Sequence, residues 1–380
     1  MRRELQAEHL PITWEELDLH TSPPSTLATW KRIGELSKAL KTFDNQYPDL
    51  IGTTAGLTPF SPVPDAARIQ HAMLDQDKLD ELRACVDALG DQALEFRTRV
   101  EFATTLGEIS IVRNVTNLLR DDVLLADPSR LGETCQRMLR FVSLQGRGTV
   151  ISHLVRIAVT GVAFNAVAGR LAELKREAQR IDGLVRTLAE SCVDGLPAMQ
   201  TRQMLFLLTS LAKPLPPSLS FTVTEIGWLD RLLFPFVVRA GRAPLLRHAA
   251  DLISAYAPQA ESSRTLASVR HLESLAMALR ESHDPSHHLM VTFDPFDDSI
   301  PRMAYECRLH GRLLLSALHD EPWPEDWSDP LHPTLRALVR GGRTVGAYCL
   351  GKDEMDHLGN KPNRYFPLLE RFTPLKPPPP

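Results

Sequence analysis

The densest group of side chains that can bind a metal lies in one polar, proline-containing segment. It consists of His283, Asp284, His287 and His288, and three further carboxylates follow at Asp294, Asp297 and Asp298. Zinc needs about four ligands that converge in a tetrahedron, and the spacing H-x3-H-H matches no standard zinc motif. A solvated polar loop is therefore the favoured interpretation. The alternative is a metal-dependent enzyme or metal-binding protein that uses the 283–298 loop.

A second candidate site follows a predicted strand near the C-terminus. Asp353, Asp356 and Asn360 lie on one short segment, so their side-chain oxygens can reach one cation from a single turn. Calcium prefers oxygen ligands of this kind, although the spacing is not that of an EF-hand. Calcium is the one cofactor that the sequence suggests. An ordinary hydrophilic turn is the more frequent explanation of such a segment.

The motifs that mark common active sites are absent from the sequence. There is no G-x-S-x-G elbow, no G-x-x-x-x-G-K-[ST] phosphate loop and no H-E-x-x-H helix. Gly146-Arg147-Gly148 resembles the start of a glycine-rich turn, but it joins two predicted helices and follows no strand. We predict no catalytic residues.

Apolar residues that recur at spacings of three and four predict amphipathic helices over most of the chain. A capping box of Thr13 and Glu16 starts the first helix. Asp127-Pro128 is expected to start another, with Pro in the first turn. Residues 44–76 lack a period and are expected to form a long loop, while 289–293 and 344–350 are predicted strands. Further helices are predicted over 27–43, 77–90, 91–126 (as one helix or two), 149–178, 182–212, 228–238, 244–256, 263–281 and 302–319.

Charge, cysteine usage and hydropathy exclude several classes of protein. The net charge is −4, from 43 basic and 47 acidic residues, which leaves no strong field for a phosphate backbone and disfavours nucleic acid as a partner. The five cysteines include no C-x-x-C pair, so zinc ribbons and thioredoxin-like chemistry are unsupported. Cys85 and Cys135 are expected to be small buried hydrophobes. The apolar stretch 150–167 contains His153 and Arg156, which favours a buried helix over a membrane span.

Several segments, taken in order, resemble an uncharacterised α-helical protein family of planctomycete-type bacteria. The family's opening G-x-P-[IV]-T-x-x-E-L is similar to Leu10–Leu17, its x-x-L-V-R-I-A helix to Ser152–Ala158, and its H-G-x-W-P segment to His310–Pro333. Its Y-S-V-G-x-D-G-x-D-D-G-G segment is similar to Tyr348–Asp356. The resemblance implies a fold and a lineage, and no activity.

The last of these segments also resembles the C-terminal loop of type II secretion pseudopilins, which binds calcium. Asp353 and Asp356 match acidic positions, whereas Glu354 replaces a usual Gly and His357 a usual second Asp. Members of the helical family begin with a membrane anchor just before the P-I-T-x-x-E-L stretch. Two alternatives stay open: a soluble, cytoplasmic protein, or a cell-envelope protein from which an anchor has been removed.

These observations together predict a mainly α protein, an irregular multi-helix array or bundle with a small C-terminal α/β segment. Three parts are expected: N-terminal helices and a long loop over 1–76, a helical core over 77–282, and a C-terminal segment over 283–380. Many amphipathic helices without a catalytic motif favour a non-enzymatic interaction or scaffold protein with a protein partner.

Overall fold

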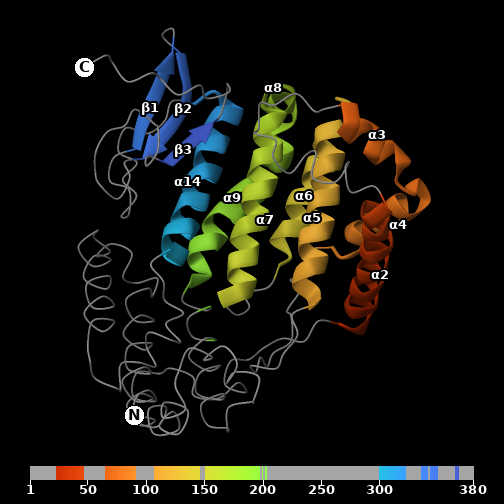
Figure 1. Cartoon of the computed structure of the whole chain (residues 1–380). Helices are drawn as coiled ribbons and strands as arrows, with labels where there is room; N and C mark the ends of the chain where they lie inside the picture. Colours follow the sequence, from red (N-terminus) through yellow and green to blue (C-terminus); the bar gives the residue numbers. More distant parts are fainter. Residues whose placement is uncertain are drawn as a thin grey trace, which may run out of the picture.

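The computed structural model describes residues 23–46, 65–90, 107–145, 150–196, 199, 202, 299–321, 335–340, 343–349 and 364–367. The described part is mainly α-helical, as the sequence predicts (Figure 1). Its helices are α2 (Pro24–Gln46), α3 (Asp65–Met73), α4 (Gln76–Ala88), α5 (Gly107–Leu125), α6 (Leu131–Ser143), α7 (Val150–Gly169), α8 (Leu171–Leu174), the 3-10 turn η3 (Lys175–Glu177), α9 (Ala178–Asp194) and α14 (Ser299–His319).

The helices pack as a two-layered array. Helix pairs α2–α4, α5–α6 and α7–α9 follow one another, and α2, α5 and α7 pack side by side while α4, α6 and α9 do the same. Helix α14 closes the array by packing on both α7 and α9 (Figure 1). Each pair therefore packs mainly on the pair next to it, as in α-helical arrays built from stacked hairpins.

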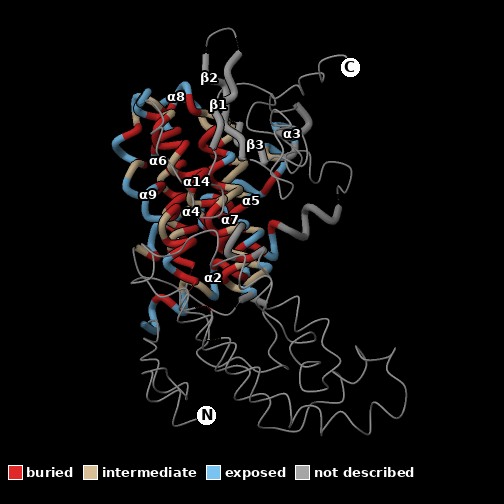
Figure 2. The backbone as a smooth tube through the Cα atoms, turned by 90° about the vertical axis from the view of Figure 1, so that its left-hand side faces the viewer, coloured by how far each residue is buried: buried red, intermediate tan, exposed pale blue. Residues whose placement is uncertain are grey.

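One hydrophobic core runs through the array. Buried residues line the inner faces of the helices from α2 to α14 (Figure 2). The cluster includes Ile33 in α2, Phe141 in α6, Phe164 in α7 and Tyr305 in α14. Residues from all three predicted parts of the chain thus share this core, while the boundaries after 76 and 282 stay predictions.

Helix α4 shows how the sequence sets one of these elements. The Asp75 carboxylate accepts a hydrogen bond from the backbone N–H of Lys78 at 3.2 Å, which caps the first turn. Leu79, Leu82 and Val86 are buried along one stripe. The chain leaves the helix at Gly90, whose φ of +64° favours glycine. The predicted helix over 77–90 is confirmed.

Other boundaries differ from the predictions. The expected loop over 44–76 is wrong for Asp65–Met73, which form α3. Pro128 does not begin a helix, because Asp127–Arg130 form a turn before α6 starts at Leu131. The single helix predicted over 149–178 is broken at Arg170, where the backbone has φ −119° and ψ 20°. The physical reason for that break lies in the role of the Arg170 side chain, described below.

Helix α7 is the only described helix long and apolar enough to cross a membrane by length and composition, over Ile151–Gly169. More than half of that window is buried inside the array. His153 and Arg156, both buried, lie within it. These properties fit a core helix, as the sequence predicts.

Strands β1 (Leu335–Arg340), β2 (Arg343–Cys349) and β3 (Arg364–Pro367) form an antiparallel sheet in the order β1-β2-β3. Leu335 pairs with Cys349 and Arg340 with Arg343, so β1 and β2 form a hairpin. Strand β2 lies where the sequence predicts a strand over 344–350. The strand predicted over 289–293 lies outside the described residues, and the expected α/β arrangement of 283–380 stays a prediction.

Candidate functional site

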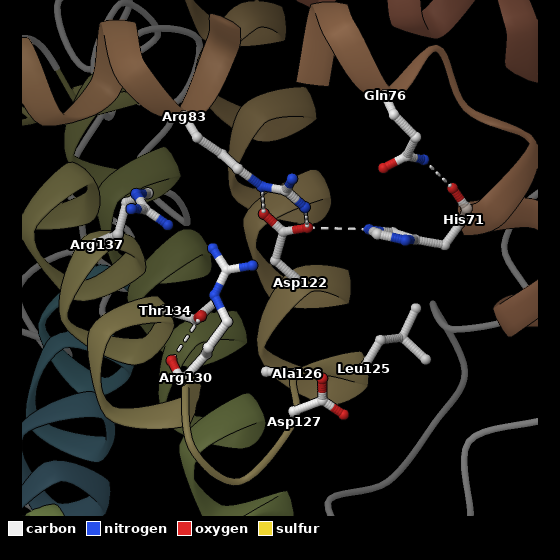
Figure 3. Close-up of a pocket in the computed structure, with 10 residues that line it drawn as sticks. All are labelled: His71, Gln76, Arg83, Asp122, Leu125, Ala126, Asp127, Arg130, Thr134 and Arg137. Carbon is white, nitrogen blue, oxygen red and sulfur yellow. Dashed lines mark hydrogen bonds and ion pairs between the residues drawn. The ribbon is translucent and has the colours of Figure 1, made fainter. Parts of the chain in front are cut away.

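A polar pocket of about 260 Å³ opens between α3, α4, the end of α5 and the start of α6 (Figure 3). Its lining is dominated by charged side chains and holds few apolar ones. The residues that matter for its chemistry are His71, Arg83, Asp122, Asp127, Arg130 and Arg137. Three of them are arginines, which suit the planar recognition of anions.

Asp122 is the buried centre of this pocket. Its side chain is 2% exposed and receives two hydrogen bonds from Arg83, one of them from Nε to Oδ2 at 2.8 Å. His71 Nε2 lies 2.9 Å from Oδ1 of the same carboxylate. The Asp122 side chain therefore connects α5 to both α3 and α4 by hydrogen bonds (Figure 3).

The electrostatics of Asp122 follow from this pairing. Burial by itself would raise the pKa of the Asp122 carboxyl, but the hydrogen bonds and charges of Arg83 and His71 outweigh burial and hold this pKa below its usual value. The same contact raises the pKa of Arg83. Asp122 and Arg83 thus neutralise each other within the pocket.

Arg137 is also paired with carboxylates. Its Nε donates to both Asp87 oxygens at 2.8 and 2.9 Å, and its Nη2 donates to Glu133 at 2.8 Å. The Arg137 side chain is 9% exposed, whereas both carboxylates are about half exposed. The guanidinium therefore joins α6 to α4 and adds no unbalanced positive charge.

The turn at the edge of the pocket is held by Arg170. Its guanidinium donates to the backbone carbonyls of Val123, Leu124 and Ala126 at 2.9–3.1 Å. These carbonyls at the end of α5 have no partner within the helix, and a cation stabilises them. The side chain must leave the path of α7 to reach them. These hydrogen bonds satisfy the carbonyls at the end of α5 and account for the break at Arg170.

Arg130 differs from the other arginines of the pocket. Arg130 occupies the N-cap position of α6, but its side chain makes no capping hydrogen bond. Among the described residues its guanidinium makes no ion pair. In Figure 3 it points toward the side of the pocket where Arg83 and Asp122 lie. The first turn of α6, with its free N–H groups and positive dipole end, begins directly after it. Asp127, exposed on the same turn, and Glu133 each lie three residues from Arg130 along the chain, and Glu133 pairs with Arg137.

A second buried polar group lies between α7, α9 and α14. His153 is 1% exposed and His310 is 9% exposed. Burial lowers the pKa of each to about 4, with the charge of Arg156 adding to the effect at His153. Both imidazoles are thus neutral at physiological pH. The burial of His153 fits the predicted buried helix over 150–167.

The structure does not describe the residues that the sequence predicts to bind metals. His283, His287 and His288, and the calcium candidates Asp353, Asp356 and Asn360, lie outside the described residues. Within the described part of the chain, no group of three or more His, Cys, Asp or Glu side chains could hold a metal ion. Both metal sites stay predictions.

The pocket residues were missed at the sequence level, although one pattern pointed to them. Asp122 falls on the buried stripe of α5, three residues after Leu119 and next to Val123, both fully buried. A carboxylate on an apolar stripe implies a buried cationic partner. The partner's identity required the fold, because Arg83 is 39 residues away.

Comparison with known proteins adds no family assignment. No protein-family model, no curated protein and no solved structure matches this chain.

Proposed function

We propose that this protein is a non-enzymatic interaction protein whose helical array binds an acidic segment of a protein partner through Arg130. One observation carries the proposal. Arg83 and Arg137 are matched by carboxylates, whereas the Arg130 guanidinium has no carboxylate partner among the described residues. A guanidinium with free donors at a pocket is a binding group for a carboxylate.

The size of the pocket supports a side chain as the occupant. Small-molecule sites measure roughly 300–1,000 Å³, and about 260 Å³ falls below that range. A Glu or Asp side chain of a partner fits this space, with the remainder of the segment lying on the surface outside. The positive end of the α6 dipole adds to the preference for negative charge.

The surroundings support a rigid receptor. The Asp122 pairs, the Arg137 pairs and the Arg170 cap tie the neighbouring helices together before any ligand arrives. Preorganised groups lose little conformational entropy on binding. No described residue in the pocket combines a nucleophile with an activated base, which favours binding over catalysis.

Binding of a fluorescein-labelled hexaglutamate peptide to the full chain tests this proposal. We expect Arg130→Ala to weaken binding roughly tenfold, because it removes the charge-assisted hydrogen bonds. Asp127→Asn is expected to strengthen binding about threefold, because it removes a repelling charge. Fluorescence anisotropy at low and at physiological salt measures both, and binding should weaken as salt rises.

Two controls make the result specific. Arg113→Ala removes an exposed arginine of α5 that does not line the pocket, so it should leave binding unchanged. A labelled hexaglutamine peptide has the same length without charge and should not bind. Equal losses in Arg113→Ala and Arg130→Ala, or no binding of hexaglutamate, would overturn the proposal.

A further inference from the structure

Two buried cysteines from distant parts of the chain meet inside the array. Cys192 in α9 and Cys307 in α14 are 115 residues apart, and their Sγ atoms lie 3.5 Å from each other. Cys192 is 0% exposed and Cys307 is 7% exposed. Both are free thiols in this structure. Their wide spacing in the sequence gave no indication of this contact.

The geometry points to an intramolecular disulfide site at Cys192 and Cys307, formed when a hydroperoxide oxidises the pair. The sulfurs need to approach only from 3.5 Å to the roughly 2.05 Å of a disulfide. The bond would cross-link α9 to α14, which already pack on each other. A covalent modification of this kind is independent of the Arg130 pocket.

The surroundings shift the pKa values of the two thiols in opposite directions. The hydrogen bond between the two thiols lowers the pKa of the Cys192 thiol; burial opposes this shift, and the positive charge of Arg156 adds to it. The hydrogen bond with Cys192 and burial raise the pKa of Cys307. Either sulfur of the pair can react first as the thiolate, and the other is then the resolving thiol, because the two sulfurs are in contact.

The reaction balances with one hydroperoxide. One thiolate of the pair attacks one peroxide oxygen and breaks the O–O bond, which gives a sulfenic acid and, after protonation, one water or alcohol. The other sulfur of the pair then attacks the sulfenic sulfur, its S–H bond breaks, and the sulfenic oxygen leaves as one water with that proton. The two sulfurs lose two electrons in total, and the peroxide gains them.

Thiol counting and peptide mapping test the inference on the full chain. After treatment with hydrogen peroxide and unfolding under non-reducing conditions, we expect two of the five thiols to be lost. A non-reducing digest should contain one peptide pair joined through Cys192 and Cys307. The Tm should rise by about 4 °C, because the cross-link closes a long loop, and dithiothreitol should reverse this rise.

Matched variants separate this site from general oxidation. Cys307→Ala should abolish the linked peptide and the Tm rise. Cys135→Ala changes an equally buried thiol that has no described cysteine neighbour, and it should retain both. If Cys307→Ala does not fold, the wild-type peptide map alone decides. Five remaining thiols, a different cysteine pair, or sulfinic acid at Cys192 without a cross-link would overturn the inference.

Discussion

Asp122 shows what a single buried charge requires at the scale of one residue. Transferring a carboxylate from water into a protein interior costs several kcal/mol unless it is paired and hydrogen-bonded. Asp122 meets this condition through Arg83 and His71. Because removing one partner leaves the other buried without compensation, such a pair is costly to break even where its net contribution is small.

Asp122→Asn is therefore expected to lower the free energy of unfolding by about 3 kcal/mol. Asp80→Asn is the matched control, since Asp80 bonds the same Arg83 at 2.6 Å but is 72% exposed. Exposed ion pairs contribute at most about 1 kcal/mol. Urea unfolding of both variants measures the difference, and equal effects would show that burial does not govern this network.

Arg130 belongs to the same scale. Among the described residues its guanidinium makes no ion pair, whereas Arg83 and Arg137 beside it are matched by carboxylates. The Arg130→Ala and Asp127→Asn pair described above thus tests one charge of each sign on one turn. Neither residue is buried, so neither change should disturb the fold.

At the scale of one element, helix α14 lies close to its neighbours at Gly311. A Cβ atom placed there would lie 2.5 Å from the Ala189 Cβ of α9 and 3.0 Å from ring atoms of Phe164 in α7. Carbon atoms that are not bonded to each other do not approach to 2.5 Å in protein structures. The absence of a side chain therefore sets how near α14 can lie to α7 and α9.

Gly311→Ala is expected to destabilise the protein by about 1–2 kcal/mol. Overpacking a core costs about 1–3 kcal/mol, and the better helix propensity of Ala returns up to about 1 kcal/mol. Gly183→Ala in α9 is the control, because nothing lies within 4 Å of the position that its new methyl group would take. That change should stabilise by up to about 1 kcal/mol. Thermal unfolding of both variants compares them, and a stabilising Gly311→Ala would contradict the close packing.

The array as a whole carries buried histidines between its last helices. His153 and His310 both have a pKa of about 4 in the folded protein, against about 6.5 in an unfolded chain. Between these two values the unfolded state binds more protons than the folded state. Stability is therefore complete above pH 6.5 and falls as the pH falls toward 4.

The free energy of unfolding should accordingly fall by about 2 kcal/mol per histidine between pH 7 and pH 5. In His153→Gln, about half of this loss should disappear. Comparison at pH 8, where the wild-type imidazoles are neutral in both states, isolates the packing effect of the substitution. Asp122 acts in a separate window, because its lowered pKa costs stability only below about pH 4. A wild-type protein equally stable at pH 5 and pH 8 would contradict the buried neutral histidines.

The sequence predicted the elements better than their boundaries. Helices α4 and α14 follow from apolar spacing alone, and the cap at Asp75 and the exit at Gly90 are local features. The break at Arg170 and helix α3 were missed. Arg170 leaves its helix to bind carbonyls more than 40 residues away, and α3 places His71 against Asp122 across 51 residues. The spacing of residues within one segment cannot predict either of these contacts.

The sequence by itself determined that this is a mainly α protein, because hydrophobic periodicity and capping act within a few residues. The buried histidine in α7 and the buried thiol at Cys135 also follow from position on an apolar stripe. Only the tertiary structure decided which charges are paired, that Arg130 has no ion pair among the described residues, and that Cys192 contacts Cys307. These are properties of pairs, and a pair distant along the chain exists only after the helices have packed.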